Sequence, residues 1–263
     1  MQGVVARLAA FALVVVGSFG TAYGLGQKLP GNPESKPHTH GAAPADPVPA
    51  VYEVDGYVLV TEAERSTTSA LALHVNDPNG QRVTEFTLAH GSKLHVVLIR
   101  PDLSGFQHVH PDIDGNGTFV VPIDEPGKWH VVIDTQPAGA AAPIVLATNV
   151  DDEVGVPEVE LPGPDDSVTV GELGVRRDGF DFTVSAADGS GSAVDGLEPY
   201  LGQAAHLIAI RKGDLAYTHV HAMGATADTF SFHGSLPAGT YRLFLQFGYR
   251  GQVITVPFTV VQP

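Results

Sequence analysis

Short apolar runs separated by turn-forming residues fill the chain from Val51 to its end. The first half contains YVLV, ALALHV, KLHVVLI, FQHVH, TFVVPI, KWHVVI and PIVLATNV. The second half contains VTVGEL, FDFTVSA, AHLIAI, YTHVH, TFSFHGSL, TYRLFLQF and ITVPFTVV. Runs of this length between Gly, Pro, Asn and Asp are typical of β-strands. Seven runs per half, spaced by roughly 8 to 12 residues, predict an all-β fold of two tandem immunoglobulin-like β-sandwich domains.

The N-terminus departs from this pattern. Leu8 to Gly26 is an uncharged, mainly apolar segment between Arg7 and Lys28, long enough to cross a bilayer as a helix. The alternative is a signal peptide cleaved near Ala22-Tyr23-Gly24. Because the run exceeds the usual signal length of roughly 7 to 15 apolar residues, we favour the uncleaved anchor. In either form the two β-sandwich domains lie outside the cytoplasm, either attached to the cell membrane by a single transmembrane helix or secreted.

Composition divides the chain into four parts. Residues 1–28 hold the transmembrane anchor or signal segment, and residues 29–50 form a disordered linker rich in Pro, with His38 and His40 as an His-x-His pair. That pair either binds metal weakly or belongs to a plain polar spacer. The stretch 151–166 is acidic and rich in Pro and Gly, so we place one sandwich in residues 51–152 and the other in 153–263.

A histidine pattern occurs twice, 111 residues apart. Each copy has a lone His thirteen residues before an His-x-His pair, with an apolar run and an Arg between them. The histidines are His95, His108 and His110 in the first copy, and His206, His219 and His221 in the second. A duplication, or a shared structural demand, accounts for this register.

Hairpin geometry brings each set of histidines together. If Pro101 to Ser104 forms a four-residue loop, His95 faces His110, and a loop from Lys212 to Leu215 likewise pairs the second set. Opposed residues lie about 4.5–5.5 Å apart at Cβ. Alternate residues share a strand face, so the first His of each His-x-His pair joins the same patch. We therefore predict three converging imidazoles in each domain.

Three imidazoles with an open position suit Cu(II) or Zn(II). In the second copy Met223 would join them if the strand persists, and a thioether favours copper, particularly Cu(I). In the first copy the next candidate is His130, where the second copy has Arg242. We therefore predict two related but unequal sites. In the alternative interpretation the histidines are structural and hydrogen-bond a loop or the neighbouring domain.

Composition narrows the function further. The net charge of -15, without a basic stripe, argues against nucleic-acid binding and favours attraction of cations. The chain has no cysteine, which excludes disulfides, thiolate metal sites, iron–sulfur clusters and a blue-copper sulfur ligand. No nucleophile elbow, paired-carboxylate cleft or glycine-rich phosphate loop is recognisable, so we expect no enzyme activity.

The sequence from Asp112 to Gly117 matches the opening of a calcium loop, but Ile123 stands at the twelfth position, which favours a tight turn.

The segments LHVVLIRPDLSGFQHVHP and AHLIAIRKGDLAYTHVHAM carry a family resemblance that extends over residues 55–263. The chain resembles uncharacterised secreted or membrane-anchored actinobacterial proteins whose immunoglobulin-like or cupredoxin-like modules are associated with heavy metals, especially copper. The resemblance implies no established activity and supports only the six histidines as site residues. The lack of cysteine departs from electron-transfer cupredoxins.

These observations predict an extracytoplasmic protein that binds a transition metal, copper first and zinc second, for metal buffering, delivery or resistance. The predicted ligands are His95, His108, His110, His206, His219, His221 and Met223. The alternative is a non-enzymatic interaction module that docks an extracytoplasmic protein partner and uses its histidines structurally.

Overall fold

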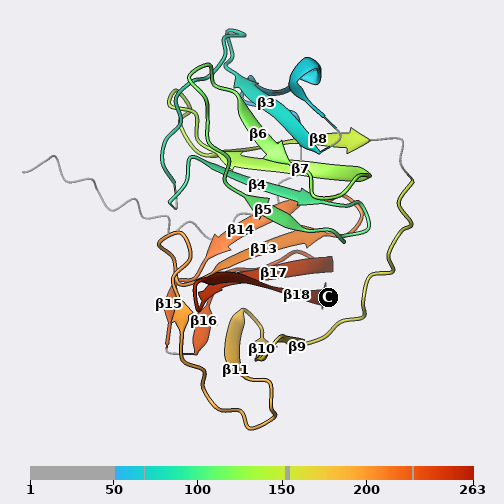
Figure 1. The fold of residues 1–263 in the computed structure, drawn as a ribbon, viewed down its shortest axis with the longest axis vertical. Helices are drawn as coiled ribbons and strands as arrows, with labels where there is room; N and C mark the ends of the chain where they lie inside the picture. Colours follow the sequence, from blue (N-terminus) through green and yellow to red (C-terminus); the bar gives the residue numbers. More distant parts are fainter. Residues whose placement is uncertain (1–50, 68, 90, 152–154, 227) are drawn as a thin grey trace, which may run out of the picture. The chain divides into compact units, whose positions relative to one another are not determined.

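The computed structural model describes residues 51–263, except 68, 90, 152–154 and 227 (Figure 1). The predicted anchor or signal segment and the linker lie outside these residues. Within the described part of the chain, no helix is long and apolar enough to cross a membrane.

The first repeat consists of two antiparallel sheets and one short 3₁₀ helix, η1 (Ala63–Arg65). One sheet has the order β1-β2-β3-β6, and the other has the order β5-β4-β7-β8. The strands of the first sheet are β1 (Glu53–Val54), β2 (Tyr57–Thr61), β3 (Ala70–Asn76) and β6 (Phe119–Pro122). Those of the second are β4 (Leu94–Ile99), β5 (Gln107–Val109), β7 (Lys128–Thr135) and β8 (Ile144–Asp151).

The second repeat has the same plan. One sheet has the order β15-β16-β11-β10-β9; the other runs β12-β17-β13-β14, with β18 also paired to β17. The first sheet contains β9 (Ser167–Val170), β10 (Leu173–Asp178), β11 (Asp181–Ala186), β15 (Gly224–Ala225) and β16 (Thr229–Ser231). The second contains β12 (Leu197–Glu198), β13 (His206–Arg211), β14 (Tyr217–His221), β17 (Gly239–Tyr249) and β18 (Gln252–Gln262).

The strand order is that of an immunoglobulin-like sandwich. In that fold the first, second and fifth core strands form one sheet, and the third, sixth and seventh form the other. Here β2, β3 and β6 face β4, β7 and β8, while β10, β11 and β16 face β13, β17 and β18. The all-β class and the duplication of the fold, both predicted from the strand pattern, are confirmed.

A corner near the start of the sixth core strand supports this assignment. The Tyr241 hydroxyl donates to the backbone carbonyl of Pro237, four residues upstream, at 3.0 Å. Trp129 occupies the equivalent place in the first repeat, and its indole N–H donates to the Glu125 carbonyl at 2.9 Å. Both rings are buried. An aromatic side chain that bonds back to the upstream backbone at this corner is a feature of immunoglobulin-like domains.

Strands β4 and β13 are apolar on both faces. On β4, Leu94, Val96 and Leu98 enter the core of the first repeat, whereas Val97 and Ile99 belong to a separate cluster. That cluster also contains Ile208 and Ile210 of β13. Both strands therefore read as unbroken apolar runs because each is covered twice, once by its own sandwich and once by the other repeat.

The two repeats lie within a single compact unit and pack sheet against sheet. Figure 1 shows β4 and β5 lying against β13 and β14. The Phe106 and Phe244 rings, one from each repeat, stack across this inter-repeat interface with centroids 3.8 Å apart and planes 10° apart. Burial of apolar surface from both repeats is the favourable contribution that holds the two sheets together.

We expect Phe244→Ala to lower the free energy of unfolding by about 3–5 kcal/mol, since it removes a buried aromatic ring from the interface. Val253→Ala, at a half-exposed position of β18, is the control and should change it by less than about 0.5 kcal/mol. Chemical denaturation measures both. Equal effects of the two substitutions would show that the inter-repeat stacking contributes little to stability.

Candidate metal centre

The hairpin register predicted for the histidines is confirmed. In the first repeat Val96 pairs with Val109, and Val97 pairs with His108. The same register, continued by one residue, places His95 opposite His110. In the second repeat His206 pairs directly with His221. The second loop spans Lys212–Leu215 as expected, because the Arg211 N–H bonds to the Ala216 carbonyl at 3.0 Å.

The first loop is tighter than predicted. The Arg100 N–H bonds to the Ser104 carbonyl at 2.9 Å, so the turn closes one residue early. Gly105, with φ of 67°, follows as the extra residue before β5 and restores the register. A positive φ at a bulge favours glycine.

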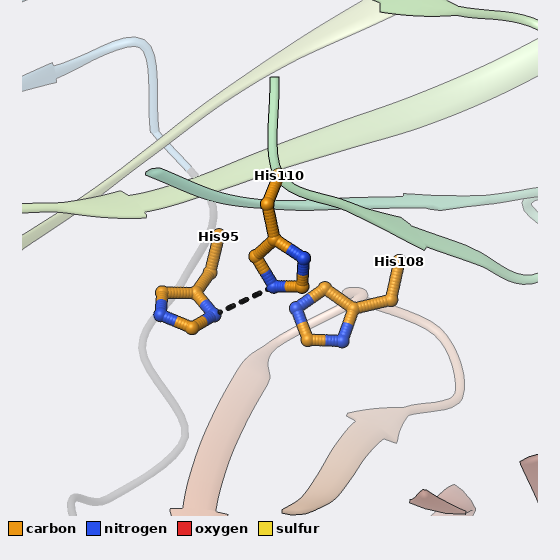
Figure 2. A group of neighbouring side chains, drawn as sticks. All are labelled: His95, His108 and His110. Atoms are coloured by element: carbon orange, nitrogen blue, oxygen red, sulfur yellow. Dashed lines mark hydrogen bonds between the residues drawn. The ribbon is translucent and has the colours of Figure 1, made fainter. Parts of the chain in front are cut away.

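The first triad joins a buried histidine to two half-buried ones. His95 lies on β4, His108 on β5 and His110 directly after β5. The His110 ring centroid lies 4.8 Å from that of His95 and 4.5 Å from that of His108. One nitrogen of each ring lies within 4.8 Å of the others, and Figure 2 shows the three rings pointing toward one another. Such a group could hold a metal ion.

The second triad repeats this arrangement. His206 is fully buried on β13, while His219 and His221 lie on β14. The His221 ring centroid is 4.7 Å from that of His206 and 4.6 Å from that of His219. Its ligand nitrogens also lie within 4.8 Å of one another, so this group too could hold a metal ion.

The two triads are neighbours. The His95 ring centroid lies 5.1 Å from that of His219, and the His108 centroid lies 5.6 Å from it. These separations match those within each triad, so the six rings form one group at the inter-repeat interface, here called the six-histidine cluster. The sequence left open whether the two sets act apart. The sequence feature that indicates contact between the two repeats is the apolar character of β4 and β13 on both faces.

Backbone carbonyls fix the tautomer of the two lone histidines. His95 Nε2 donates to the Ala89 carbonyl at 3.2 Å, and His206 Nε2 donates to the Tyr200 carbonyl at 2.9 Å. A carbonyl only accepts, so in the neutral ring the Nδ1 lone pair of each histidine faces the cluster. These lone pairs accept from His110 Nε2 and His219 Nε2, each at 3.1 Å.

Each middle histidine takes a partner from the other repeat. His108 Nδ1 donates to Gln246 Oε1 at 2.6 Å, and the Gln246 amide donates to Thr255 at 2.9 Å, which fixes its orientation. His219 Nδ1 lies 3.4 Å from Asp134 Oδ2. Asp134 is the β7 strand partner of His95, and Gln246 is the β17 strand partner of His206, so Asp134 and Gln246 occupy equivalent positions in the two repeats. Each repeat therefore supplies one contact to the middle histidine of the other repeat.

The bond to Gln246 leaves His108 Nε2 as a lone-pair nitrogen. This atom is buried and has no hydrogen-bond partner among the described residues. Figure 2 shows it pointing toward His95 and His110. Buried polar atoms in folded proteins are nearly always paired, so an unpartnered one indicates a missing ligand, ion or water.

Burial keeps the imidazoles of His108 and His110 neutral. It lowers the pKa of His108 well below the ordinary value, and the nearby His219 and His110 rings lower it further. Burial, followed by the His95 and His206 rings, lowers the pKa of His110 to about 4. A neutral imidazole is the form that binds metal, so both rings are ready as ligands near neutral pH.

A cleft of about 340 Å³ reaches the cluster at one edge of the inter-repeat interface. His108, Tyr200 and Gln246 line it where it meets the cluster. Phe106, Pro122 and Thr255 form other parts of its wall. An ion could approach the first triad from solvent along this route.

Two sequence-based extensions of the site do not have the geometry on which they depended. Strand β14 ends at His221, and the Met223 side chain is 60% exposed, so the strand that was to carry its thioether to the histidines does not persist. His130 lies opposite Ile99 at the far end of β4 from His95, and it bonds to Asn149 at 2.7 Å. The structure therefore corrects the expected extension of the first set by His130.

The tight turn expected in place of a calcium loop is present. Asp114 Oδ1 accepts from the backbone N–H groups of Asn116 and Thr118, each at 2.9 Å. The carboxylate thus closes its own turn.

The fold and the cluster define a tandem β-sandwich protein with histidines at the junction of its repeats. Residues 52–152 and 167–262 both match the family described as Domain of unknown function (DUF8832), and the chain belongs to this family in two copies. The duplication inferred from the histidine pattern is therefore confirmed. No curated protein matches the chain.

Among solved structures the chain is similar to a two-domain fibronectin type-III segment from chicken tenascin. They share 11% identity over 78% of this chain and 97% of that one, with a TM-score of 0.21. A DUF3823 family protein from Bacteroides uniformis shares 14% identity over 72% of this chain and 96% of its own, with a TM-score of 0.20. Similarity at these scores is weak, and the strand order alone defines the immunoglobulin-like fold.

We expect the metal-free protein to lose stability as the pH falls from about 6.5 to about 4. The pKa of His110 is about 4 when folded and roughly 6.5 when unfolded, so the unfolded chain binds the proton more tightly. The stabilisation is complete above the unfolded pKa and declines below it. Melting temperature against pH measures this. His110→Gln should reduce the slope, whereas His233→Gln, at an exposed position, should not; identical slopes in both variants would contradict the assignment.

Proposed function

We propose that the six-histidine cluster binds transition-metal ions, copper first and zinc second. The observation that carries this proposal is the buried, unpartnered lone pair of His108 Nε2, aimed at two further ring nitrogens. Leaving such an acceptor unsatisfied costs about 1–3 kcal/mol. A bound ion would remove that penalty.

The spacing of the nitrogens supports metal ligation. In each triad two ring nitrogens lie 3.1 Å apart. Two imidazole nitrogens at about 2.0–2.1 Å from a tetrahedral zinc ion would be separated by roughly 3.3 Å. An ion could therefore replace the proton shared by each pair with little movement of the rings.

The outer contacts support it as well. Metal-ligating histidines commonly donate their second ring N–H to a carbonyl or carboxylate, which fixes the ring and raises its basicity. The carbonyls of Ala89 and Tyr200 accept from the lone histidines, and Gln246 and Asp134 are the partners of the middle ones.

The ligand set favours copper and zinc. Imidazole nitrogen suits both, and among divalent first-row ions a given nitrogen site binds Cu(II) most tightly. Copper therefore stands first on affinity. The Met223 thioether does not contribute to this preference, because β14 ends before that residue.

We place this binding outside the cytoplasm, where the N-terminal apolar segment would direct the chain. The proposed role is buffering, delivery or resistance, without catalysis. The acidic excess of the chain would raise the local concentration of cations.

A second candidate is an interaction module with structural histidines. It is favoured by the bond between His108 and Gln246, which joins the two repeats without any ion. In that case the cluster would hold the repeats in register so that outer surfaces dock a partner protein.

Calorimetric titration with Cu(II) and Zn(II) separates these candidates. The full-length chain carries His38→Ala and His40→Ala, so that the linker pair adds no signal. We expect the further double substitution His108→Ala/His219→Ala to weaken binding by more than about 100-fold, since loss of an outer partner alone lowers affinity about 10–100-fold. His233→Ala, at an exposed position, is the matched control.

The metal should also raise the melting temperature of the parent and leave that of the double variant unchanged. Melting without metal shows that the double variant is folded. Absence of binding, or binding that the double substitution does not alter, would contradict the metal proposal and favour the structural role.

A further inference from the structure

We infer that the six-histidine cluster is a dinuclear centre in which the second triad fills before the first. The inference rests on the proposed metal binding and adds the number of ions, their proximity and their order. It follows from three features of the cluster: the adjacency of the triads, the exchange of outer partners and the difference between Asp134 and Gln246.

Adjacency argues for a close pair of ions. Each triad offers three nitrogens within 4.8 Å of one another, enough for one ion with an open position. The rings of His95 and His219, from different triads, have centroids only 5.1 Å apart. Two ions, one in each triad, would therefore be close neighbours.

The exchange of partners makes the two sites interdependent. Gln246 of the second repeat orients His108 of the first, and Asp134 of the first repeat lies against His219 of the second. Each triad therefore depends on the other repeat for the outer contact of its middle histidine. The centre belongs to the pair of repeats.

The equivalent acceptors differ in charge. A carboxylate beside the Nδ1–H of a metal-bound imidazole stabilises the positive charge that the ion imposes on the ring, and it raises ligand basicity. A metal ion on His219 Nε2 would displace the proton that this nitrogen donates to His206 in the metal-free protein, so that Nδ1 carries the N–H that faces Asp134 Oδ2, 3.4 Å away. Gln246 offers His108 only a neutral amide oxygen. The His219 side chain is 2% exposed, so water screens the interaction weakly. The second triad should hold the tighter ion.

The test exchanges the side-chain chemistry of Asp134 and Gln246 by isosteric substitutions. The background for every variant is the chain with His38→Ala and His40→Ala. Zn(II) is the probe, in competition with a chelator of known affinity. The parent should bind two ions in two resolved steps. Asp134→Asn should weaken the first step about 10–100-fold, the range for loss of an outer-shell partner, and Gln246→Glu should strengthen the second by a similar factor.

The double exchange Asp134→Asn/Gln246→Glu should reverse the order of filling. His219→Ala should therefore remove the tighter step in the parent, and His108→Ala should remove it in the double exchange. Melting temperatures establish that each variant is folded, and Gln246→Glu tests the inference alone if Asp134→Asn is not.

Cu(II) reports on proximity. At two equivalents the electron paramagnetic resonance spectrum should show dipolar coupling between two ions, and at one equivalent an isolated ion. One ion per chain, two steps that Asp134→Asn and Gln246→Glu leave unchanged, or two uncoupled Cu(II) signals would overturn the dinuclear, ordered centre while leaving metal binding intact. Absence of any binding would instead overturn the proposed function.

Discussion

The packing of one repeat's sheet against the other is the contact on which the rest of the structure depends. It covers the second face of β4 and β13 with Val97, Ile99, Ile208 and Ile210. The same faces carry His95 and His206 at their ends, so the apolar contact also buries the lone histidines. Burial, in turn, keeps His108 and His110 neutral. Without the interface, each triad would be a solvated patch on a strand.

The strands and the hairpin register could be read from the sequence because they depend on local rules. Apolar runs between turn residues gave the strands, and the equal spacing of His95 and His206 from their His-x-His pairs fixed which residues oppose each other. Face-to-face association of the repeats could not be derived. An apolar run such as VVLI shows that both faces are covered, but it does not show by what.

The outer partners were hidden for a related reason. Asp134 and Gln246 are ordinary polar positions near the ends of long strands, and only the meeting of the repeats brings them to His219 and His108. The sequence predicts two unequal sites through His130 and Met223, whereas in the structure the two triads differ in the outer partners Asp134 and Gln246. His130 lies four residues along β7 from the position that faces His95, and Met223 follows the end of β14. Strand ends are set by tertiary contacts as much as by local pattern.

Duplication explains how the six-histidine cluster is assembled from two copies of one sequence pattern. Each repeat supplies three imidazole rings and one outer partner, Asp134 or Gln246. That partner contacts the middle histidine of the other repeat. The sheets of the two copies pack against each other, and the two triads differ in the residue opposite the lone histidine, which is Asp134 in the first repeat and Gln246 in the second.

Anomalous diffraction at the zinc and copper absorption edges, from crystals of the full-length chain grown with each metal, tests this account most directly. The account predicts two anomalous peaks, one within each triad. No peak in the six-histidine cluster, with peaks elsewhere or none at all, would contradict it.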